Sequence, residues 1–84
     1  MITRLQVRMA RAALGWSARD LGKQAGIARN TVTRLENGLG IHISTLSQIQ
    51  SALEKAGIVF IPADGAAGPG IRLTNTKLTI KADD

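Results

Sequence analysis

The segment from Ala28 to Gly38 combines hydrogen-bonding side chains with helical spacing. Wound as a helix, it puts Val32 and Leu35 on one side and five polar residues on the other, which are Arg29, Asn30, Thr33, Arg34 and Asn37. An arginine can pair bidentately with guanine O6 and N7, an asparagine can pair with adenine N6 and N7, and a threonine methyl can contact a thymine methyl. Taken alone, this spacing favours an ordinary solvated helix face. Only together with the basic half and the two-helix motif described below does it predict contacts with base edges in DNA by Arg29, Asn30, Thr33 and Arg34.

The charge distribution agrees with this chemistry. The chain has 84 residues, a formal net charge of +5 and a pI of about 10.9. Residues 1–40 contain seven basic and two acidic residues, whereas residues 41–84 contain four of each, so the whole excess lies in the first half. A basic half favours a polyanionic partner such as nucleic acid, although a charge that only keeps the protein soluble has the same composition.

Other classes of site lack the residues that they need. The chain has no cysteine, six acidic residues and a single histidine, His42, which is expected in a surface loop. We therefore expect no metal site, no cofactor and no catalytic centre. The stretch GAAGPG lacks the Gly-Lys-Ser/Thr of a phosphate-binding loop and is expected to connect two strands. In so small a core we also expect no ligand pocket.

The sequence also predicts where the protein resides. No apolar run approaches the roughly 18 residues of a membrane span, and the first residues contain no signal-peptide core. Since the absence of cysteine suits a reducing compartment, we expect a cytoplasmic protein.

Four helices are expected to position the polar face, over residues 3–14, 18–25, 28–37 and 45–56. In the first helix, apolar residues recur at a spacing of three to four, at Leu5, Met9, Ala12 and Ala13. In the fourth helix they recur at Leu46, Ile49, Leu53 and Ala56. These stripes predict one shared helical core.

The helix boundaries are marked by caps. Ser17 is a good N-cap for the second helix, and Asp20 three residues later completes a capping box. Trp16, just before this cap, is expected in the core rather than stacked on a base. Gly26 ends the second helix because glycine accepts positive φ. Ser44 is the expected N-cap of the fourth helix.

After Gly57 the periodicity changes from helix to strand. The stretch IVFIP is β-branched and aromatic, whereas IRLT and KLTIK alternate apolar and polar residues. The expected fold class is therefore mostly α, with four helices followed by a short C-terminal β-hairpin or small sheet.

Residues Ala18 to Leu35 predict two short helices that meet at a tight turn around Gly26 and cross closely because Gly22 is small. The pattern comprises Leu21, Gly22, Gly26, Ile27, Val32, Leu35 and Glu36-Asn37-Gly38. Over residues 5–56 it resembles the Cro/C1-type helix-turn-helix family of phage repressors and Xre-like bacterial regulators. The resemblance implies a lambda-repressor-like four-helix domain and a sequence-specific DNA-binding transcriptional regulator, more often a repressor than an activator.

Two positions depart from the family pattern. Ala28 stands where the family often has Ser or Thr as the N-cap of the recognition helix, and Ala18 stands where the phage repressors have a polar residue. The first change weakens the start of the helix, and the second removes one possible DNA contact. The C-terminal stretch AGIVFI…GPGIRL is similar to a tail on some small bacterial members of the family.

Further contacts are expected around the motif. Candidates for the DNA backbone are Ser17, Arg19, Lys23 and Asn37, with Arg4 and Arg8 as weaker ones. The resemblance also implies that Arg11 pairs with Glu36 in a partly buried structural salt bridge, so that Glu36 is not a catalytic acid.

The strand residues predict an assembly. Ile58 and Phe60 are expected to point one way, and Val59 and Ile61 the other, so both faces are apolar. Because the helices can cover only one face, we expect a homodimer through Ile58–Ile61 that reads two half-sites about 34 Å apart in a palindromic operator. The expected units are residues 1–57 for DNA binding, 58–81 as a dimerisation extension and 82–84 as a tail. The alternative function is a protein-interaction module, such as an antitoxin that binds a toxin and its own promoter.

Overall fold

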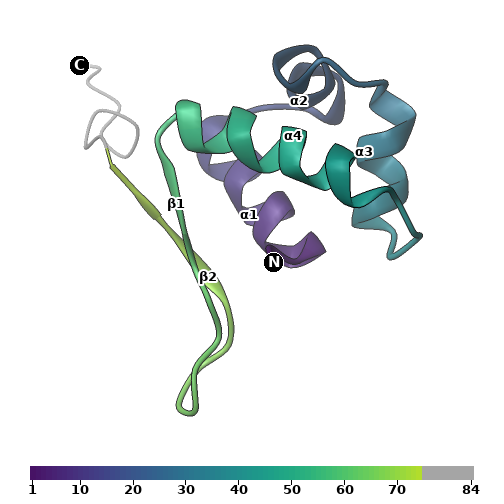
Figure 1. The fold of residues 1–84 in the computed structure, drawn as a ribbon. Coiled ribbons are helices and arrows are strands. Elements are labelled where there is room, and N and C mark those ends of the chain that lie inside the picture. Colours follow the sequence, from purple (N-terminus) through teal and green to yellow (C-terminus); the bar gives the residue numbers. More distant parts are fainter. Residues whose placement is uncertain (75–84) are drawn as a thin grey trace, which may run out of the picture.

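The structure is a computed structural model that describes residues 1–74 of the chain (Figure 1). Its elements are α1 (Arg4–Leu14), α2 (Ala18–Ala25), α3 (Arg29–Glu36), α4 (Ile43–Lys55), β1 (Ile58–Ile61) and β2 (Gly70–Leu73). The predicted fold class, four helices followed by a two-stranded hairpin, is confirmed. The strand predicted from KLTIK and the tail at residues 82–84 lie outside the described residues. Within residues 1–74, no helix is both long enough and apolar enough to cross a membrane.

A single core joins the helices to the hairpin. Every helix contributes fully buried side chains, and Ile58 of β1, only 2% exposed, lies in the same cluster. The core residues are Ile2, Val7, Ala10, Leu21, Val32, Ile49, Ala52, Leu53 and Ile58. The first strand is therefore part of the same hydrophobic core as the helices.

The predicted apolar stripe of α1 is wrong. Leu5 and Met9 are 54% and 37% exposed, whereas Val7 and Ala10 are completely buried. The helix carries apolar residues on both sides, so its periodicity alone does not decide which side faces the core. The side that faces the core includes the buried Gln6, whose amide nitrogen donates to the hairpin.

The Gln6 amide connects α1 to the hairpin. Its Nε2 donates to the carbonyl oxygens of Ile61, at 3.0 Å, and Gly70, at 2.9 Å, while its Oε1 accepts from the backbone N–H of Thr3 at 2.9 Å. Ile61 and Gly70 face each other in the antiparallel register of β1 and β2. A buried polar side chain is tolerated here because each of its polar atoms has a partner.

The start of α2 was predicted correctly and the start of α4 was not. Ser17 and Asp20 form the predicted capping box, and Gly26 ends α2 in the left-handed conformation with φ of 73°. Helix α4 begins at Ile43 with His42 as its N-cap, so Ser44 lies inside the first turn. The prediction relied on a side-chain cap, and the start of α4 has none, so the sequence carries no signal at His42.

Candidate nucleic-acid interface

Helices α2 and α3 form a tight helix-turn-helix. A Cβ atom built on Gly22 would lie 2.8 Å from the carbonyl oxygen of Ile27 and 3.3 Å from the backbone nitrogen of Arg29. These contacts are too close for any side chain, so the crossing of α2 with the turn requires glycine at this position. The predicted reason for a small residue at Gly22 is thereby confirmed.

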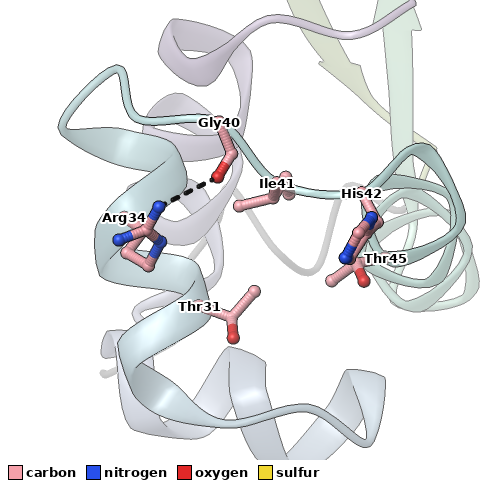
Figure 2. A pocket seen from close by; sticks show the side chains of 6 residues that line it. All are labelled: Thr31, Arg34, Gly40, Ile41, His42 and Thr45. Atoms are coloured by element: carbon pink, nitrogen blue, oxygen red, sulfur yellow. Dashed lines mark hydrogen bonds between the residues drawn. The ribbon is translucent and has the colours of Figure 1, made fainter.

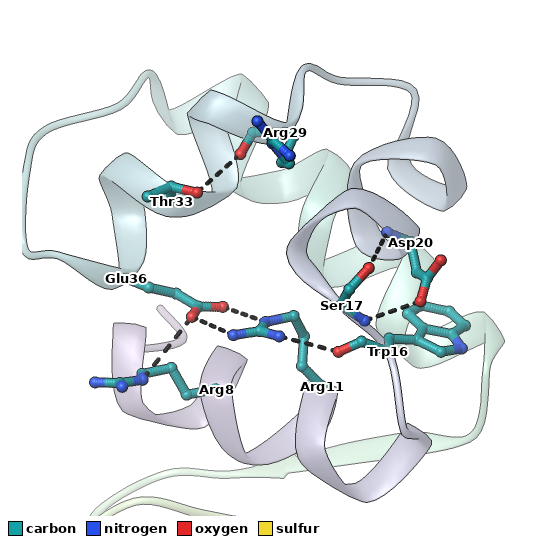
Figure 3. A network of polar contacts seen from close by, with 8 residues as sticks. All are labelled: Arg8, Arg11, Trp16, Ser17, Asp20, Arg29, Thr33 and Glu36. Carbon is teal, nitrogen blue, oxygen red and sulfur yellow. Dashed lines mark hydrogen bonds and ion pairs between the residues drawn. The ribbon is translucent and has the colours of Figure 1, made fainter.

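Helix α3 buries one side and exposes the other. Val32 is completely buried, Leu35 is half-buried, and the five polar residues of the opposite side are exposed. Those five are Arg29, Asn30, Thr33, Arg34 and Asn37. The hydroxyl of Thr33 donates to the carbonyl oxygen of Arg29 at 3.3 Å (Figure 3). This bond uses the hydroxyl proton within the helix.

Helix α2 and its N-cap present three of the predicted contacts to the DNA backbone. Ser17, Arg19 and Lys23 are exposed. Ser17 is already engaged, because its Oγ accepts from the N–H of Asp20 at 3.0 Å and its own N–H donates to Asp20 Oδ2 at 2.9 Å (Figure 3). The bond from the backbone N–H of Ser17 to the carboxylate, and after it the interaction of the carboxylate with the Ser17 side chain, lower the pKa of Asp20. The carboxylate thus supplies the negative charge that the start of α2 favours. Among the three predicted backbone contacts of this region, Arg19 and Lys23 are the two exposed cations.

An ion pair ties α1 to the end of α3. Arg11 donates from Nε and Nη2 to the two carboxylate oxygens of Glu36, at 2.6 and 2.7 Å (Figure 3). Its Nη1 also donates to the carbonyl oxygen of Trp16 at 2.9 Å. The hydrogen bond to Glu36 raises the pKa of Arg11, against the opposing effect of burial, and the charge of Glu36 acts in the same direction. One side chain therefore fixes α3 and the connection to α2 relative to α1.

The other arginines of α1 also lie near Glu36. Arg8, whose side chain is 59% exposed, approaches the Glu36 carboxylate at 3.8 Å. Arg4 donates to the backbone carbonyl oxygen of Glu36 at 3.4 Å, and its guanidinium lies close to Gly38. Because the Glu36 carboxylate pairs with two guanidinium groups and a third, that of Arg4, lies at the Glu36 backbone, this side of the motif keeps a net positive charge.

The structure contains a pocket that the sequence did not predict. A cavity of about 470 Å³ lies between α3, the loop that follows it and the first turn of α4 (Figure 2). Its lining consists of Thr31, Arg34, Gly40, Ile41, His42 and Thr45. This hollow opens at the surface beside Arg34, Gly40 and His42, which are exposed, so it lies outside the core in which we expected no ligand pocket. The sequence places Thr31 and Arg34 three residues apart on one side of α3, so these two lining residues could be predicted to lie together. The lining residues from the loop could not be predicted, since their position depends on the path of the chain.

The hairpin has an inner and an outer face. Ile58 is buried and Phe60 half-buried against the helices, whereas Val59 and Ile61 are 40% and 42% exposed. Of the four residues expected at a dimer interface, only the latter two lie open to a partner. Figure 1 shows the hairpin on the side of the helical body away from α3.

The comparisons agree with this geometry. A family model described as helix-turn-helix, HTH_3, matches residues 7–57, more than half of the chain. A search of curated proteins found no match to the chain. The matched range contains α2, α3 and the ion pair between Arg11 and Glu36. The chain therefore belongs to the Xre/Cro-C1-like helix-turn-helix family, whose members are DNA-binding regulators.

Proposed function

We propose that this protein represses transcription by binding a palindromic operator as a homodimer, with α3 in the major groove of each half-site. The single observation that carries the proposal is the exposed polar side of α3 on a helix-turn-helix whose opposite side is buried. The proposed mechanism is occupancy of a promoter operator. Activation is the alternative outcome, since a small bound protein can also contact polymerase without a further domain.

The proposed base contacts are Arg29, Asn30, Thr33 and Arg34. Arg29 and Asn30 are the strongest candidates, because they lie at the start of α3, the end that enters the groove in this motif. Thr33 would offer its methyl group, since its hydroxyl is bonded within the helix. A good bidentate pair discriminates between bases by about 1–3 kcal/mol.

The proposed backbone contacts are Ser17, Arg19, Lys23 and Asn37. Arg19 and Lys23 are exposed cations on α2, and neutralisation of a phosphate by a cation releases counterions, which makes binding depend on salt. These contacts set the position of the protein on the duplex and carry no sequence information.

The proposed homodimer uses the outer face of the hairpin. Val59 and Ile61 are large aliphatic side chains that are 40% and 42% exposed. A two-fold arrangement of this face gives an isologous interface, the commonest kind in soluble oligomers. Sedimentation of the full chain at micromolar concentration tests it: a dimer that Val59→Asp dissociates is expected, and a monomeric wild-type protein contradicts it. A second protein that copurifies in place of a second copy favours the antitoxin alternative.

The DNA-binding proposal is tested with sequences selected from a random duplex pool by the purified protein. Arg29→Ala and Asn30→Ala are expected to lower the affinity for the selected sequence by about tenfold to a hundredfold each. Lys55→Ala is the matched control, since it removes the same charge from an exposed position at the last residue of α4, outside both α3 and the proposed dimer face. Equal effects of Arg29→Ala and Lys55→Ala would mean that α3 does not read the bases.

A further inference from the structure

The outer side of α1 carries an apolar strip that residues 1–74 leave largely open. Leu5 and Met9 are 54% and 37% exposed, and they lie four residues apart on one side of the helix. Ala12, which is also exposed, extends the same side by a further turn. These three residues form the α1 strip, an apolar surface with room for a partner.

The α1 strip lies between the hairpin and a row of basic residues. On one side, α1 packs against β2 (Figure 1), and Gln6 donates to the carbonyl oxygen of Gly70 there. On the other side, Arg4 donates to the backbone of Glu36, and Arg8 approaches its carboxylate. Since successive residues of an α-helix are offset by about 100°, the strip falls between these two sides.

The hairpin offers an open edge next to the strip. Within residues 1–74 the sheet consists of β1 and β2 alone, so one edge of β2 has no strand beside it there. The end of β2 is fixed, because Thr74 donates to the carbonyl oxygen of Gly57 from its backbone N–H, at 2.9 Å, and from its Oγ1, at 3.2 Å. A chain that turns after Thr74 can return antiparallel along β2, since such a connection needs only a short turn.

The sequence of residues 75–84, which lie outside the described part of the chain, suits both the strip and its basic side. In the stretch KLTIK, Leu78 and Ile80 alternate with polar residues, so a strand there has one apolar face. Alternate residues of a strand are about 6.6 Å apart, close to the roughly 6 Å that separates residues four positions apart along a helix. Asp83 and Asp84 follow and carry the charge opposite to that of the arginines.

We propose that residues 77–84 dock on the α1 strip of the same chain, as a third strand beside β2. The bond from Gln6 to Gly70 places the first turns of α1 at the start of β2, so the returning segment passes Met9 before it reaches Leu5. Its first apolar residue therefore contacts Met9, and its second contacts Leu5.

The acidic end adds a charged component to the docking. Asp83 and Asp84 reach the N-terminal part of α1, where Arg4 and Arg8 lie. Within residues 1–74, the one carboxylate in contact with these two arginines is that of Glu36, 3.8 Å from Arg8. Arg4 and Arg8, the weaker candidates for the DNA backbone, thereby gain an internal partner. The docking involves neither α3 nor DNA and stands apart from the proposed function.

The apolar contacts are tested by methyl NMR on the full chain. Nuclear Overhauser contacts are expected between the methyl groups of Leu78 and Met9, and between those of Ile80 and Leu5. A sample that mixes labelled and unlabelled copies separates contacts within one chain from contacts between two. Contacts seen only between copies would assign the segment to a second molecule and overturn docking within the chain. Absence of contacts between the segment and α1 overturns the docking surface altogether.

Hydrogen exchange tests the third strand. Leu78→Ser combined with Ile80→Ser is expected to speed amide exchange in β2 by about tenfold, while the amides of α4, the internal reference, stay unchanged. Lys77→Ser combined with Thr79→Ser is the matched control, because both substitutions fall on the opposite face of the proposed strand. Equal exchange in β2 for the two double variants contradicts the third strand.

The charged component is tested with Asp83→Asn combined with Asp84→Asn. The side-chain Nε–H signals of Arg4 and Arg8 are expected to shift, whereas Arg19, an exposed arginine on α2, keeps its signal. Unchanged signals at Arg4 and Arg8, or an equal shift at Arg19, show that the acidic end takes no part in the docking.

Discussion

The carboxylate of Glu36 and the guanidinium of Arg11 face each other as a two-bond pair, at 2.6 and 2.7 Å. Their side chains are only 9% and 24% exposed. The pair connects α1 to the last residue of α3 and, through the carbonyl oxygen of Trp16, to the start of the α2 segment. The orientation of α3 therefore depends on a contact with α1, a helix outside the helix-turn-helix itself.

Loss of one partner of this pair is expected to destabilise the fold strongly. Arg11→Met leaves a nearly buried carboxylate and is expected to lower the free energy of unfolding by about 3 kcal/mol. Arg8→Met is the matched control: its side chain is 59% exposed and 3.8 Å from Glu36, so its loss is expected to cost about 1 kcal/mol or less. Urea denaturation measures both. Similar losses for the two variants contradict a structural role specific to Arg11.

Gly22→Ala reverses the usual effect of alanine in a helix. Alanine normally stabilises a helix interior by about 1 kcal/mol relative to glycine. Here the new Cβ atom would lie 2.8 Å from the carbonyl oxygen of Ile27, so we expect a net loss of about 1–3 kcal/mol. Gly65→Ala meets no heavy atom within 4 Å and is expected to leave the thermal midpoint nearly unchanged. A more stable Gly22→Ala protein would contradict the close crossing.

Gln6→Leu is expected to loosen the hairpin. Gln6 is only 2% exposed, and the substitution removes the three hydrogen bonds of its side chain, two of which go to the strands. Loss of a buried polar partner costs about 1–3 kcal/mol, and we expect faster hydrogen exchange in β1 and β2 than in α4. Gln48→Leu is the control, since Gln48 is exposed and makes one long bond of 3.5 Å, to Ala25. Unchanged exchange in the hairpin of Gln6→Leu rules out the connection.

The capping box at α2 predicts a dependence on acid. The pKa of Asp20 is lowered in the folded state, so its stabilising effect is fully present above the unfolded pKa of about 3.9 and is lost as the pH falls through the folded value. The thermal midpoint of Asp20→Asn is therefore expected to lie below that of the wild type at pH 7, with a gap that closes as the pH falls from about 5 to about 2.

The control for this series is Glu54→Gln, which changes an exposed carboxylate on α4 that lies outside any helix N-terminus. A gap between wild type and Asp20→Asn that stays constant down to the lowest pH shows that the carboxylate of Asp20 does not act as a charged cap.

The sequence alone determined those features of this protein that depend on residues close together in the chain. The box of Ser17 and Asp20, the stop at Gly26 and the exposed side of α3 each depend on residues within a few positions of one another, so spacing is sufficient to predict them. The same holds for Gly22, because the turn that approaches it follows within five residues. The pairing of Arg11 with Glu36 was accessible only through the family resemblance.

Only the tertiary structure decided which side of α1 is buried, where α4 begins and that a pocket lies beside α3. Helix α1 is apolar on two sides, and the buried side contains Gln6, whose acceptors Ile61 and Gly70 lie 55 and 64 residues away. A polar residue can be buried in a core when partners distant in the sequence satisfy its hydrogen bonds. The periodicity of apolar residues along one helix contains no information about such partners. The pocket likewise exists because the loop at Gly40 and His42 returns past Arg34, which donates to the carbonyl oxygen of Gly40, and no pattern within the loop records that contact.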